Sequence, residues 1–298
     1  MPVILFLFFI SFFLSNALYR PSLTISELLG AIDKPNERKI HLVPTARTGG
    51  LTMYLPFVFI LISAPIGTAL KIPLILGCST IFFLGLLDDT ASISPHIKLM
   101  GQFLALSVYH FTAEYFNSDF SSLWGVIVAI WIIFITNATN IIDGLDGLAG
   151  GICASEALCL LSLAIIFENS DIAVCLILLL GAIIGFLPRN FPKSSIFMGD
   201  CGALFLGFTL AILSSILITQ SKSILCLLSV LLIFRIPIYD TNVSIIRRLF
   251  KHQSPFKADK EHFHHLLLKH GFTRECATLA LITTSLFFGF LGVIICIL

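Results

Sequence analysis

The chain alternates between long apolar runs and short polar stretches. A helix needs about 20 apolar residues to cross the hydrocarbon layer of a membrane. The pattern predicts ten such helices, at residues 3–19, 50–68, 72–87, 99–116, 121–138, 149–167, 172–188, 202–219, 223–239 and 276–298. Several connections, such as 69–71 and 220–222, are short enough for tight helical hairpins. We therefore predict an all-α, polytopic integral membrane protein, with residues 1–298 forming a single transmembrane domain.

Composition agrees with this class. Hydrophobic residues make up 57% of the chain and charged residues 12%, whereas soluble domains carry about 25% charged residues. A net charge of +1 gives no reason to expect a nucleic-acid partner. The eight cysteines form no CxxC pair and lie mostly inside apolar runs, which argues against a disulfide framework or a structural zinc site.

The distribution of basic residues predicts the orientation. No basic residue precedes the first apolar run and Arg20 follows it, which is the reverse of a secretory signal peptide. With the N-terminus outside, 15 of the 18 Lys and Arg residues fall in cytoplasmic connections, as the positive-inside rule requires. The polar motifs then all lie on the cytoplasmic side.

The stretch NATNIIDGLDGLAGG, residues 137–151, places amides and acids between two apolar runs. Asn137, Asn140, Asp143 and Asp146 are three residues apart and fall roughly on one face if the segment is helical. A carboxylate so close to hydrocarbon needs water, a cation or a partner. A polar turn would also contain Asn, Asp and Gly, but two acids in register with two amides favour a functional site.

A second acidic motif ends the third predicted span. Asp88 and Asp89 are adjacent there, and Lys98 opens the fourth span. Adjacent carboxylates repel unless a cation or a proton offsets them, so the pair suggests divalent-metal or base chemistry. Solvated acids in a loop are the alternative interpretation.

A third motif, FMGDCG, places Asp200 at the start of the eighth predicted span. Asp200 could simply cap the helix. The same short loop also contains Asn190, Lys193 and Phe197, which offer an amide, a cation and an aromatic face to a nucleotide.

Two basic segments complete the set. The loop DKPNERKIHLVPTARTGG, which includes Arg47, combines basic residues with glycines at a helix start, an arrangement that suits a phosphate but also fixes topology. His262, His264 and His265 are too concentrated for core histidines. Zinc is one possibility, but no nearby cysteines complete a site, so a phosphate-binding cluster is favoured.

These motifs resemble a known family, the polyprenyl-phosphate N-acetylhexosamine-1-phosphate transferases. DKPNxRKxH, the paired Asp after the third span, NxxNxxDGxDGLxGG, FMGDxG and SPFxxDxxHxHHLLLxxGF occur in family order over residues 30–285. The HFHH form, with Pro255 and the Asp259–Lys260 context, is similar to the branch that transfers GlcNAc-1-phosphate to undecaprenyl phosphate. The peptidoglycan branch usually has three consecutive histidines, whereas Phe263 separates His262 from His264 here.

The resemblance implies a cytoplasmic active site that uses Mg²⁺ or Mn²⁺. Asp200 would ligate the metal, with Asp143 beside it, and Asp143 and Asp146 would complete an acidic cleft. Asp88 and Asp89 would lie at the lipid-phosphate side, with Asp88 the candidate base. Substrate binding would fall to Asn140, Asn190, Phe197, Lys98 and Arg47, with Phe197 and Asn190 at the uracil. His262, His264 and His265 would hold a phosphate or order the loop over the sugar.

The implied reaction moves GlcNAc-1-phosphate from UDP-GlcNAc to undecaprenyl phosphate and releases UMP. It would start the synthesis of O-antigen or another cell-envelope polysaccharide. The protein would lie in the bacterial inner membrane, with its N-terminus in the periplasm. Direct attack by the lipid phosphate is favoured over a covalent Asp intermediate, because a phosphate oxygen is already an anionic nucleophile. A donor such as UDP-FucNAc or UDP-MurNAc-pentapeptide is the main alternative. A cation-coupled transporter and a polyprenyl-carrier phosphatase are more remote. Membrane lipid surrounds the chain, and a homodimer is one possible assembly.

Overall fold

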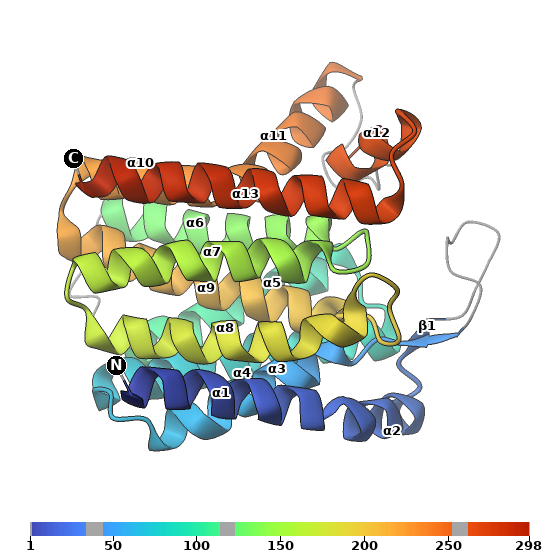
Figure 1. Ribbon diagram of the computed structural model, residues 1–298, viewed down its shortest axis with the longest axis horizontal. Helices are drawn as coiled ribbons and strands as arrows, with labels where there is room; N and C mark the ends of the chain where they lie inside the picture. The colour runs from blue at the N-terminus through green and yellow to red at the C-terminus, as the bar shows by residue number, and fades with distance from the viewer. Residues whose placement is uncertain (1, 34–43, 114–122, 252–261, 298) are drawn as a thin grey trace.

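The computed structural model describes residues 2–33, 44–113, 123–251 and 262–297. Most helices lie side by side in a bundle, with both termini at one end and β1 and α12 at the other (Figure 1). The elements in chain order are α1 (Pro2–Ala17), α2 (Tyr19–Leu29), β1 (Ile32–Asp33), β2 (Thr45–Ala46), α3 (Gly49–Ser63), α4 (Thr68–Ala91), α5 (Pro95–Thr112), α6 (Leu123–Ile142), α7 (Leu148–Ile166), α8 (Ser170–Asn190), α9 (Gly199–Ser221), α10 (Ile224–Ile233), α11 (Arg235–Phe250), α12 (Phe263–Lys269) and α13 (Arg274–Ile297). The two strands pair antiparallel, with Ile32 opposite Ala46.

The helical, multi-pass architecture is confirmed, but the count of ten spans is not. In the described ranges six helices are long and apolar enough to cross a membrane: α4, α6, α7, α8, α9 and α13. Two bent pairs, α1 with α2 at 45° and α10 with α11 at 73°, raise the number to eight if each pair is one span. The predicted second and fourth spans correspond to α3, which has only 15 residues, and to α5.

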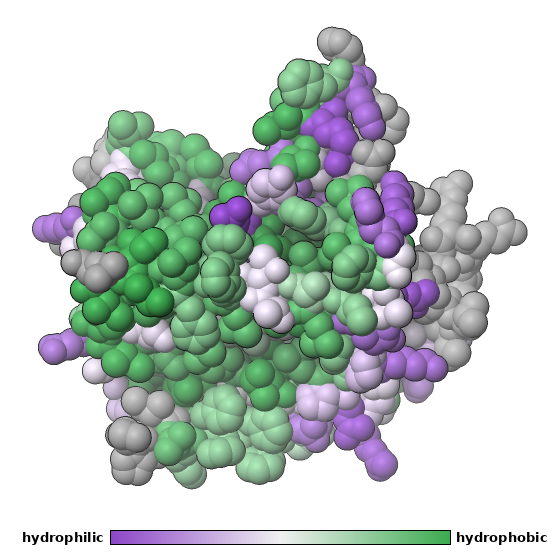
Figure 2. All heavy atoms as spheres, turned by 45° about the horizontal axis from the view of Figure 1, so that its top comes forward, coloured by the Kyte–Doolittle hydropathy of each residue, from purple (hydrophilic) through white to green (hydrophobic). Residues whose placement is uncertain are grey.

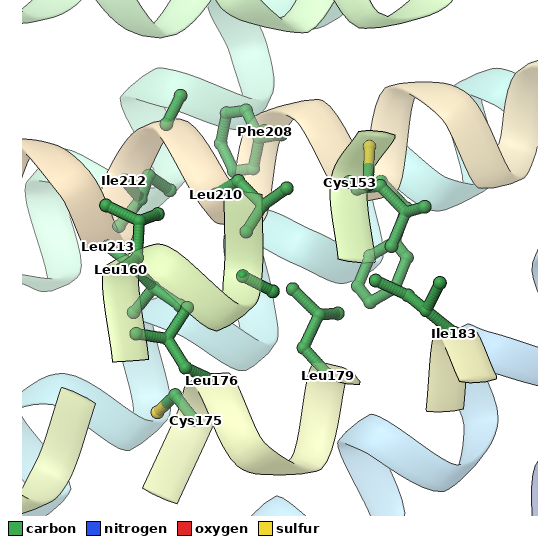
Figure 3. Packing of buried hydrophobic residues seen from close by; sticks show 14 of the residues in the cluster. Cys153, Leu160, Cys175, Leu176, Leu179, Ile183, Phe208, Leu210, Ile212 and Leu213 are labelled. Atoms are coloured by element: carbon green, nitrogen blue, oxygen red, sulfur yellow. The ribbon is translucent and has the colours of Figure 1, made fainter. Parts of the chain in front are cut away.

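Helix α9 forms the centre of the bundle. It is apolar on every side, all of its residues from Cys201 to Ile218 are buried, and it packs against α4 and α6. A helix that is hydrophobic all round is stable only when surrounded by other helices. Figure 3 shows side chains of this core, among them Leu213 of α9, Leu160 of α7 and Leu176 of α8. This core holds the first turn of α9, which carries Asp200, in a fixed position.

The outer surface separates into an apolar and a polar part. Large apolar side chains such as Phe13, Phe59, Phe83 and Phe287 are exposed, and in Figure 2 green covers most of the visible bundle. Hydrophilic residues gather on α11 and α12 and toward the end of the bundle where β1 lies. An apolar surface of this extent is expected where lipid is the solvent.

Two stretches that were predicted as polar connections are helical. Residues 20–29 belong to α2, and residues 240–250 to α11. In α11 the residues Asp240, Ser244 and Arg248 are four apart and buried, so they share one face of the helix. The apolar pattern missed this helix because its buried face is polar.

Close packing at glycine brings three helix ends together beneath the site. A Cβ added at Gly50 of α3 would lie 2.4 Å from the backbone nitrogen of Gly202 in α9. A Cβ at Gly85 of α4 would lie 2.5 Å from Cα of Cys201. The start of α3 and the end of α4 therefore contact the first turn of α9 directly, which only residues without a side chain permit.

Candidate active site

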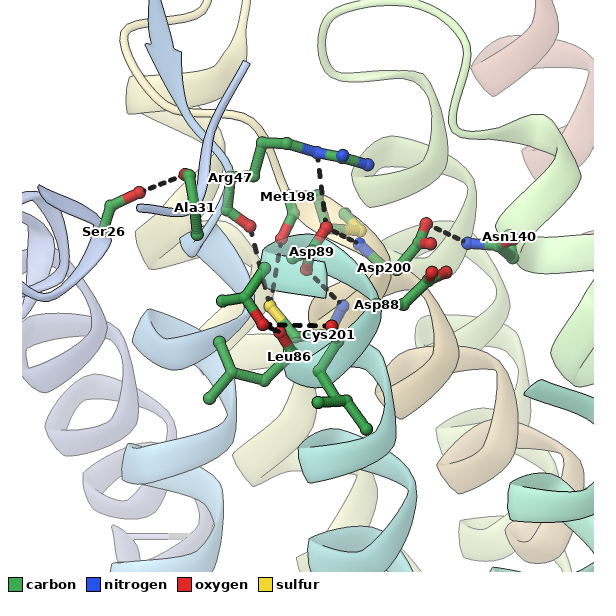
Figure 4. Close-up of polar contacts among 12 residues, drawn as sticks. Ser26, Ala31, Arg47, Leu86, Asp88, Asp89, Asn140, Met198, Asp200 and Cys201 are labelled. Carbon is green, nitrogen blue, oxygen red and sulfur yellow. Dashed lines mark hydrogen bonds and ion pairs between the residues drawn. The ribbon is translucent and has the colours of Figure 1, made fainter. Parts of the chain in front are cut away.

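Asp89 fixes the N-terminus of α9. Its Oδ1 accepts a hydrogen bond of 2.9 Å from the backbone nitrogen of Asp200, and its Oδ2 accepts one of 2.9 Å from that of Cys201 (Figure 4). Arg47 Nε lies 3.3 Å from Asp89 Oδ1. A carboxylate at a helix N-terminus satisfies free N–H groups and complements the helix dipole. Both oxygens of Asp89 are engaged in holding the site together.

Lys98 connects two of the predicted acids. Its Nζ contacts Asp88 Oδ2 and lies 2.7 Å from Asp200 Oδ2. The other Asp200 oxygen, Oδ1, accepts a hydrogen bond of 2.7 Å from Asn140 Nδ2. Asp88 Oδ1 accepts one of 2.9 Å from the backbone nitrogen of Ile93. Three motifs that lie far apart in the sequence therefore meet at Asp200.

Gly199 allows this approach. Its φ is +73°, a conformation that residues with a side chain rarely adopt, and a Cβ there would lie 1.9 Å from the carbonyl oxygen of Arg47. The segment that carries Arg47 also hydrogen-bonds Phe197, whose backbone nitrogen donates to Ala46 over 2.8 Å. Arg47 and Phe197 are thereby held beside Asp200.

The predicted residues surround a polar cavity of about 340 Å³. Its lining includes Asp33 and Arg274 together with seven of the predicted residues: Arg47, Asn140, Asp143, Asp146, Asn190, Phe197 and Asp200. Asp88, Asp89 and Lys98 are not part of the lining; they lie behind it and hold Arg47 and Asp200.

Two of the lining residues join neighbouring loops. Asn190 Oδ1 accepts a hydrogen bond of 2.9 Å from the Gly147 nitrogen, and its Nδ2 donates to the Ile196 carbonyl over 3.0 Å. Asp146 Oδ2 accepts one of 3.2 Å from the Ser194 nitrogen. Both polar atoms of the Asn190 side chain are thus hydrogen-bonded to the backbone, and its predicted role at uracil stays a prediction.

The cavity has an excess of negative charge. Burial, together with repulsion from Asp200 and Asp89, raises the pKa of Asp143 to about 7. Burial lowers the pKa of Arg47, but attraction to Asp89 and Asp200 outweighs it and the net pKa is raised. Arg47 therefore stays charged, and the crowded carboxylates favour a bound cation.

A larger groove of about 920 Å³ adjoins this cavity. Apolar side chains form one part of it, among them Leu99, Phe103, Ile130 and Phe134. Arg248 and the three predicted histidines, His262, His264 and His265, line another part. Asn140 and Gly144 line both spaces, so the polar cavity and the apolar groove meet at these two residues.

His264 packs against Gly144 at the junction of the cavity and the groove. A Cβ added at Gly144 would lie 2.3 Å from Nε2 of His264, so the ring packs directly on the 143–147 loop. Burial lowers the pKa of His264 to about 4, with a further contribution from His265. His264 is therefore neutral at physiological pH and acts here as a packed, polar ring.

The residues fit a magnesium ion by donor type. Asp143, Asp200 and Asn140 line one cavity, and Mg²⁺ prefers oxygen ligands, often one or two carboxylates supplemented by water and substrate phosphates. In the ranges the structure covers, no three His, Cys, Asp or Glu side chains are grouped so as to hold a metal ion by themselves. Asp200 and Asp143 would be the protein ligands.

Comparison with known proteins settles the family. The sequence model described as glycosyl transferase family 4 matches residues 72–218. A probable undecaprenyl-phosphate N-acetylglucosaminyl 1-phosphate transferase of Bacillus subtilis is 31% identical over 278 residues, 90% of this chain and 78% of that protein. The chain belongs to glycosyl transferase family 4.

Other members of glycosyl transferase family 4 are similar over comparable lengths. A decaprenyl-phosphate N-acetylglucosaminephosphotransferase of Mycobacterium tuberculosis is 32% identical over 84% of this chain and 72% of its own. An undecaprenyl-phosphate alpha-N-acetylglucosaminyl 1-phosphate transferase of Escherichia coli is 29% identical over 91% of this chain and 78% of its own. The resemblance drawn from the motifs is confirmed.

Sequence reasoning about this family 4 member missed Asp240, Ser244, Arg248 and Arg274. Asp240 had a usable signal, because it directly follows an apolar run, as Asp88 does. Arg248 was counted only as a topology-determining charge. Residues 34–43, with Lys34, Arg38, Lys39 and His41, and residues 252–261, with Pro255, Asp259 and Lys260, lie outside the described residues.

Proposed function

We propose that this protein transfers an N-acetylhexosamine 1-phosphate group, most simply GlcNAc-1-phosphate from UDP-GlcNAc, to undecaprenyl phosphate and releases UMP. The observation that carries the proposal is the junction of a polar cavity and an apolar groove at Asn140 and Gly144. A reaction between a water-soluble nucleotide and a membrane lipid needs such a meeting point. The names of the three relatives support the same reaction class.

The polar cavity suits the nucleotide donor. Arg47 and Arg274 line it and can bind a diphosphate, and the Phe197 ring offers a stacking surface for uracil. Because Asp89 holds Arg47 Nε, the guanidinium is oriented before substrate arrives. Asp143 and Asp200 would hold Mg²⁺ in the same space.

The groove suits the lipid acceptor. Its apolar side chains, contributed mostly by α5 and α6, provide a surface for the isoprenoid chain. Arg248 and the histidines at its polar part can bind a phosphate, which places the acceptor phosphate beside Asn140 and Gly144. A phosphate at this point faces the donor across the junction.

Catalysis in this account is mainly positioning and charge stabilisation, as in other phosphoryl transfers. Lys98 holds Asp200 in place, and Arg47 stabilises charge that develops on the leaving phosphate. The chemistry supplied by bound Mg²⁺ is neutralisation of the donor diphosphate. An oxygen of the acceptor phosphate attacks directly, because both oxygens of Asp88 are already paired with Lys98 and Ile93.

The same reasoning extends to cellular placement. We infer that the cavity opens to the cytoplasm of a bacterium, that the N-terminus is periplasmic and that the product primes a cell-envelope polysaccharide such as O-antigen. The basic residues of the polar connections support this orientation by the positive-inside rule.

A radiolabel transfer assay with purified protein tests the proposal. Undecaprenyl phosphate and Mg²⁺ are incubated with UDP-GlcNAc, UDP-GalNAc, UDP-FucNAc or UDP-MurNAc-pentapeptide in parallel. We expect lipid-linked product from UDP-GlcNAc, loss of product on chelation and at least a 10²-fold lower rate in Asp200→Asn. Asp171→Asn is the matched control, because Asp171 begins α8 at the end opposite Asn190. Product from another donor only would revise the sugar; no product from any donor would refute the transferase.

A further inference from the structure

Asp240 and His262 form a buried pair at the polar part of the groove. Asp240 Oδ2 lies 2.8 Å from His262 Nδ1, and Ser244 Oγ lies 3.1 Å from the same nitrogen. Asp240 Oδ1 accepts a hydrogen bond of 2.7 Å from the backbone nitrogen of Phe263. Only 3% of Asp240 and 7% of His262 are exposed to solvent. The carboxylate is therefore fixed at both oxygens, and it holds the ring.

This contact determines which nitrogen faces the substrate. A carboxylate only accepts hydrogen bonds, so the neutral ring must carry its proton on Nδ1 and donate it to Asp240. Nε2 then carries the lone pair, and no described residue hydrogen-bonds it. Since His262 lines the groove, Nε2 is the ring nitrogen left for a ligand there.

We propose that Asp240 is a positioning residue that holds His262 in the tautomer whose Nε2 takes the proton from the acceptor phosphate. This inference rests on the proposed function. It gives Asp240 and His262 a specific task in the transfer reaction, the delivery of a fully ionised phosphate nucleophile.

The step balances as follows. The O–H bond of the singly protonated lipid phosphate breaks, and an N–H bond forms at Nε2 of His262. The freed phosphate oxygen forms a bond to the β-phosphorus of the donor, and the bond from that phosphorus to the UMP oxygen breaks. UMP leaves with the electron pair, and the imidazolium returns its proton to UMP or to water.

Charged and titratable groups surround His262 and its neighbour His264 on α11, α12, α13 and the 143–147 loop. On α11 these are Asp240, Arg248, which lines the same groove, and Arg247, whose Nη2 lies 3.4 Å from Ser244 Oγ. On α12, His264 has its ring centroid 6.0 Å from that of His262, and His265 stands next to it. The groove residues contributed by α5 and α6 are uncharged. Asp240 is the acid that contacts His262, while Asp143 and Asp146 flank Gly144, on which the His264 ring packs. Helix α13 packs on α11 and α12 and carries Arg274 and Glu275 in its first turn.

Asp240→Asn is the decisive substitution because its outcome can be read from the contacts. The Phe263 nitrogen keeps the amide oxygen at the Oδ1 position, so the amide nitrogen takes the place of Oδ2. That nitrogen donates to Nδ1, which forces the ring proton onto Nε2 and removes the acceptor. Above the second ionisation of a phosphate monoester, at about pH 6, the acceptor no longer needs a base.

The rate of transfer is measured against pH for the wild type, Asp240→Asn, His262→Gln and the double variant, with Asp171→Asn as control. We expect Asp240→Asn to be slower by about 10-fold near pH 5 and by less than about twofold near pH 8.5, because only about a tenth of a phosphate monoester with a second pKa of about 6 is fully ionised at pH 5, whereas nearly all of it is at pH 8.5. We also expect the double variant to be no slower than His262→Gln alone, and Asp240→Glu to restore part of the rate.

A pH-independent loss in Asp240→Asn, or losses that multiply in the double variant, would overturn the inference and indicate a structural role. If Asp240→Asn does not fold, as judged by thermal unfolding, His262→Gln must show the same recovery at high pH, and a uniform loss there overturns the inference too. Failure of the wild type to form lipid-linked product would instead refute the proposed function, so the two failures are distinguishable.

Discussion

Gly144→Ala tests the junction between cavity and groove. The added Cβ would lie 2.3 Å from Nε2 and 2.5 Å from Cε1 of His264, whereas ordinary contacts begin at 3.4 Å. The ring must therefore move by about 1 Å, and it is buried, with 3% of its surface exposed. A displacement of about 1 Å near reacting groups costs about 10²-fold in rate, while overpacking costs about 1–3 kcal/mol of stability.

The assay is the transfer rate together with thermal unfolding. Gly30→Ala is the control, because Gly30 has φ +70° with nothing within 4 Å, so alanine adds backbone strain of about 1–2 kcal/mol without touching the site. We expect Gly144→Ala to lose rate and Gly30→Ala to keep it at similar stability. In a His264→Ala background, Gly144→Ala should add little further loss. A rate within about threefold of wild type for Gly144→Ala would refute the reasoning, since that displacement should cost far more.

Three further predictions concern buried charge. Lys98→Met should destabilise the protein by about 3 kcal/mol in denaturant unfolding, because it leaves the buried Asp88 and the partly buried Asp200 without their shared cation; an unchanged midpoint would contradict this. Glu156→Leu should stabilise it by about 1–3 kcal/mol, since neither Glu156 carboxyl oxygen has a hydrogen-bond partner among the described residues, and a lower melting temperature would contradict this. Stability should fall as pH drops from 6.5 toward about 4, because burial lowers the pKa of His264 and the unfolded chain binds the proton first. His264→Phe should flatten that dependence, and an equally steep curve would argue against this assignment.

The sequence predicted the helical segments and most of the site for definite physical reasons. Apolar runs must be helical in lipid, so a helix occupies each predicted span, but apolarity alone could not show that α3 has 15 residues or that α10 and α11 bend by 73°. Asp143 and Asp200 could be predicted as site residues because each is an acid next to an apolar run. The sequence could not show that Asp89 binds the α9 backbone, because that contact depends on the crossing of α4 and α9 at Gly85.

The contact between Asp240 and His262 also could not be predicted from the sequence. The two residues are 22 positions apart, and they meet because the start of α12 docks against α11, where Asp240 also accepts a hydrogen bond from the Phe263 nitrogen. Arg235 is another example: its guanidinium carbon lies 3.9 Å from the centroid of the Phe288 ring, and the residue lines neither the cavity nor the groove. Spacing along the chain carries no information about such contacts.

The most direct test of the central claim measures both products of a doubly labelled donor, with uridine and sugar carrying different isotopes. If the nucleotide and the lipid react across the junction at Asn140 and Gly144, release of UMP will require undecaprenyl phosphate and will match lipid-linked sugar one to one. Release of UMP without the lipid, or an intact donor in its presence, would contradict the account.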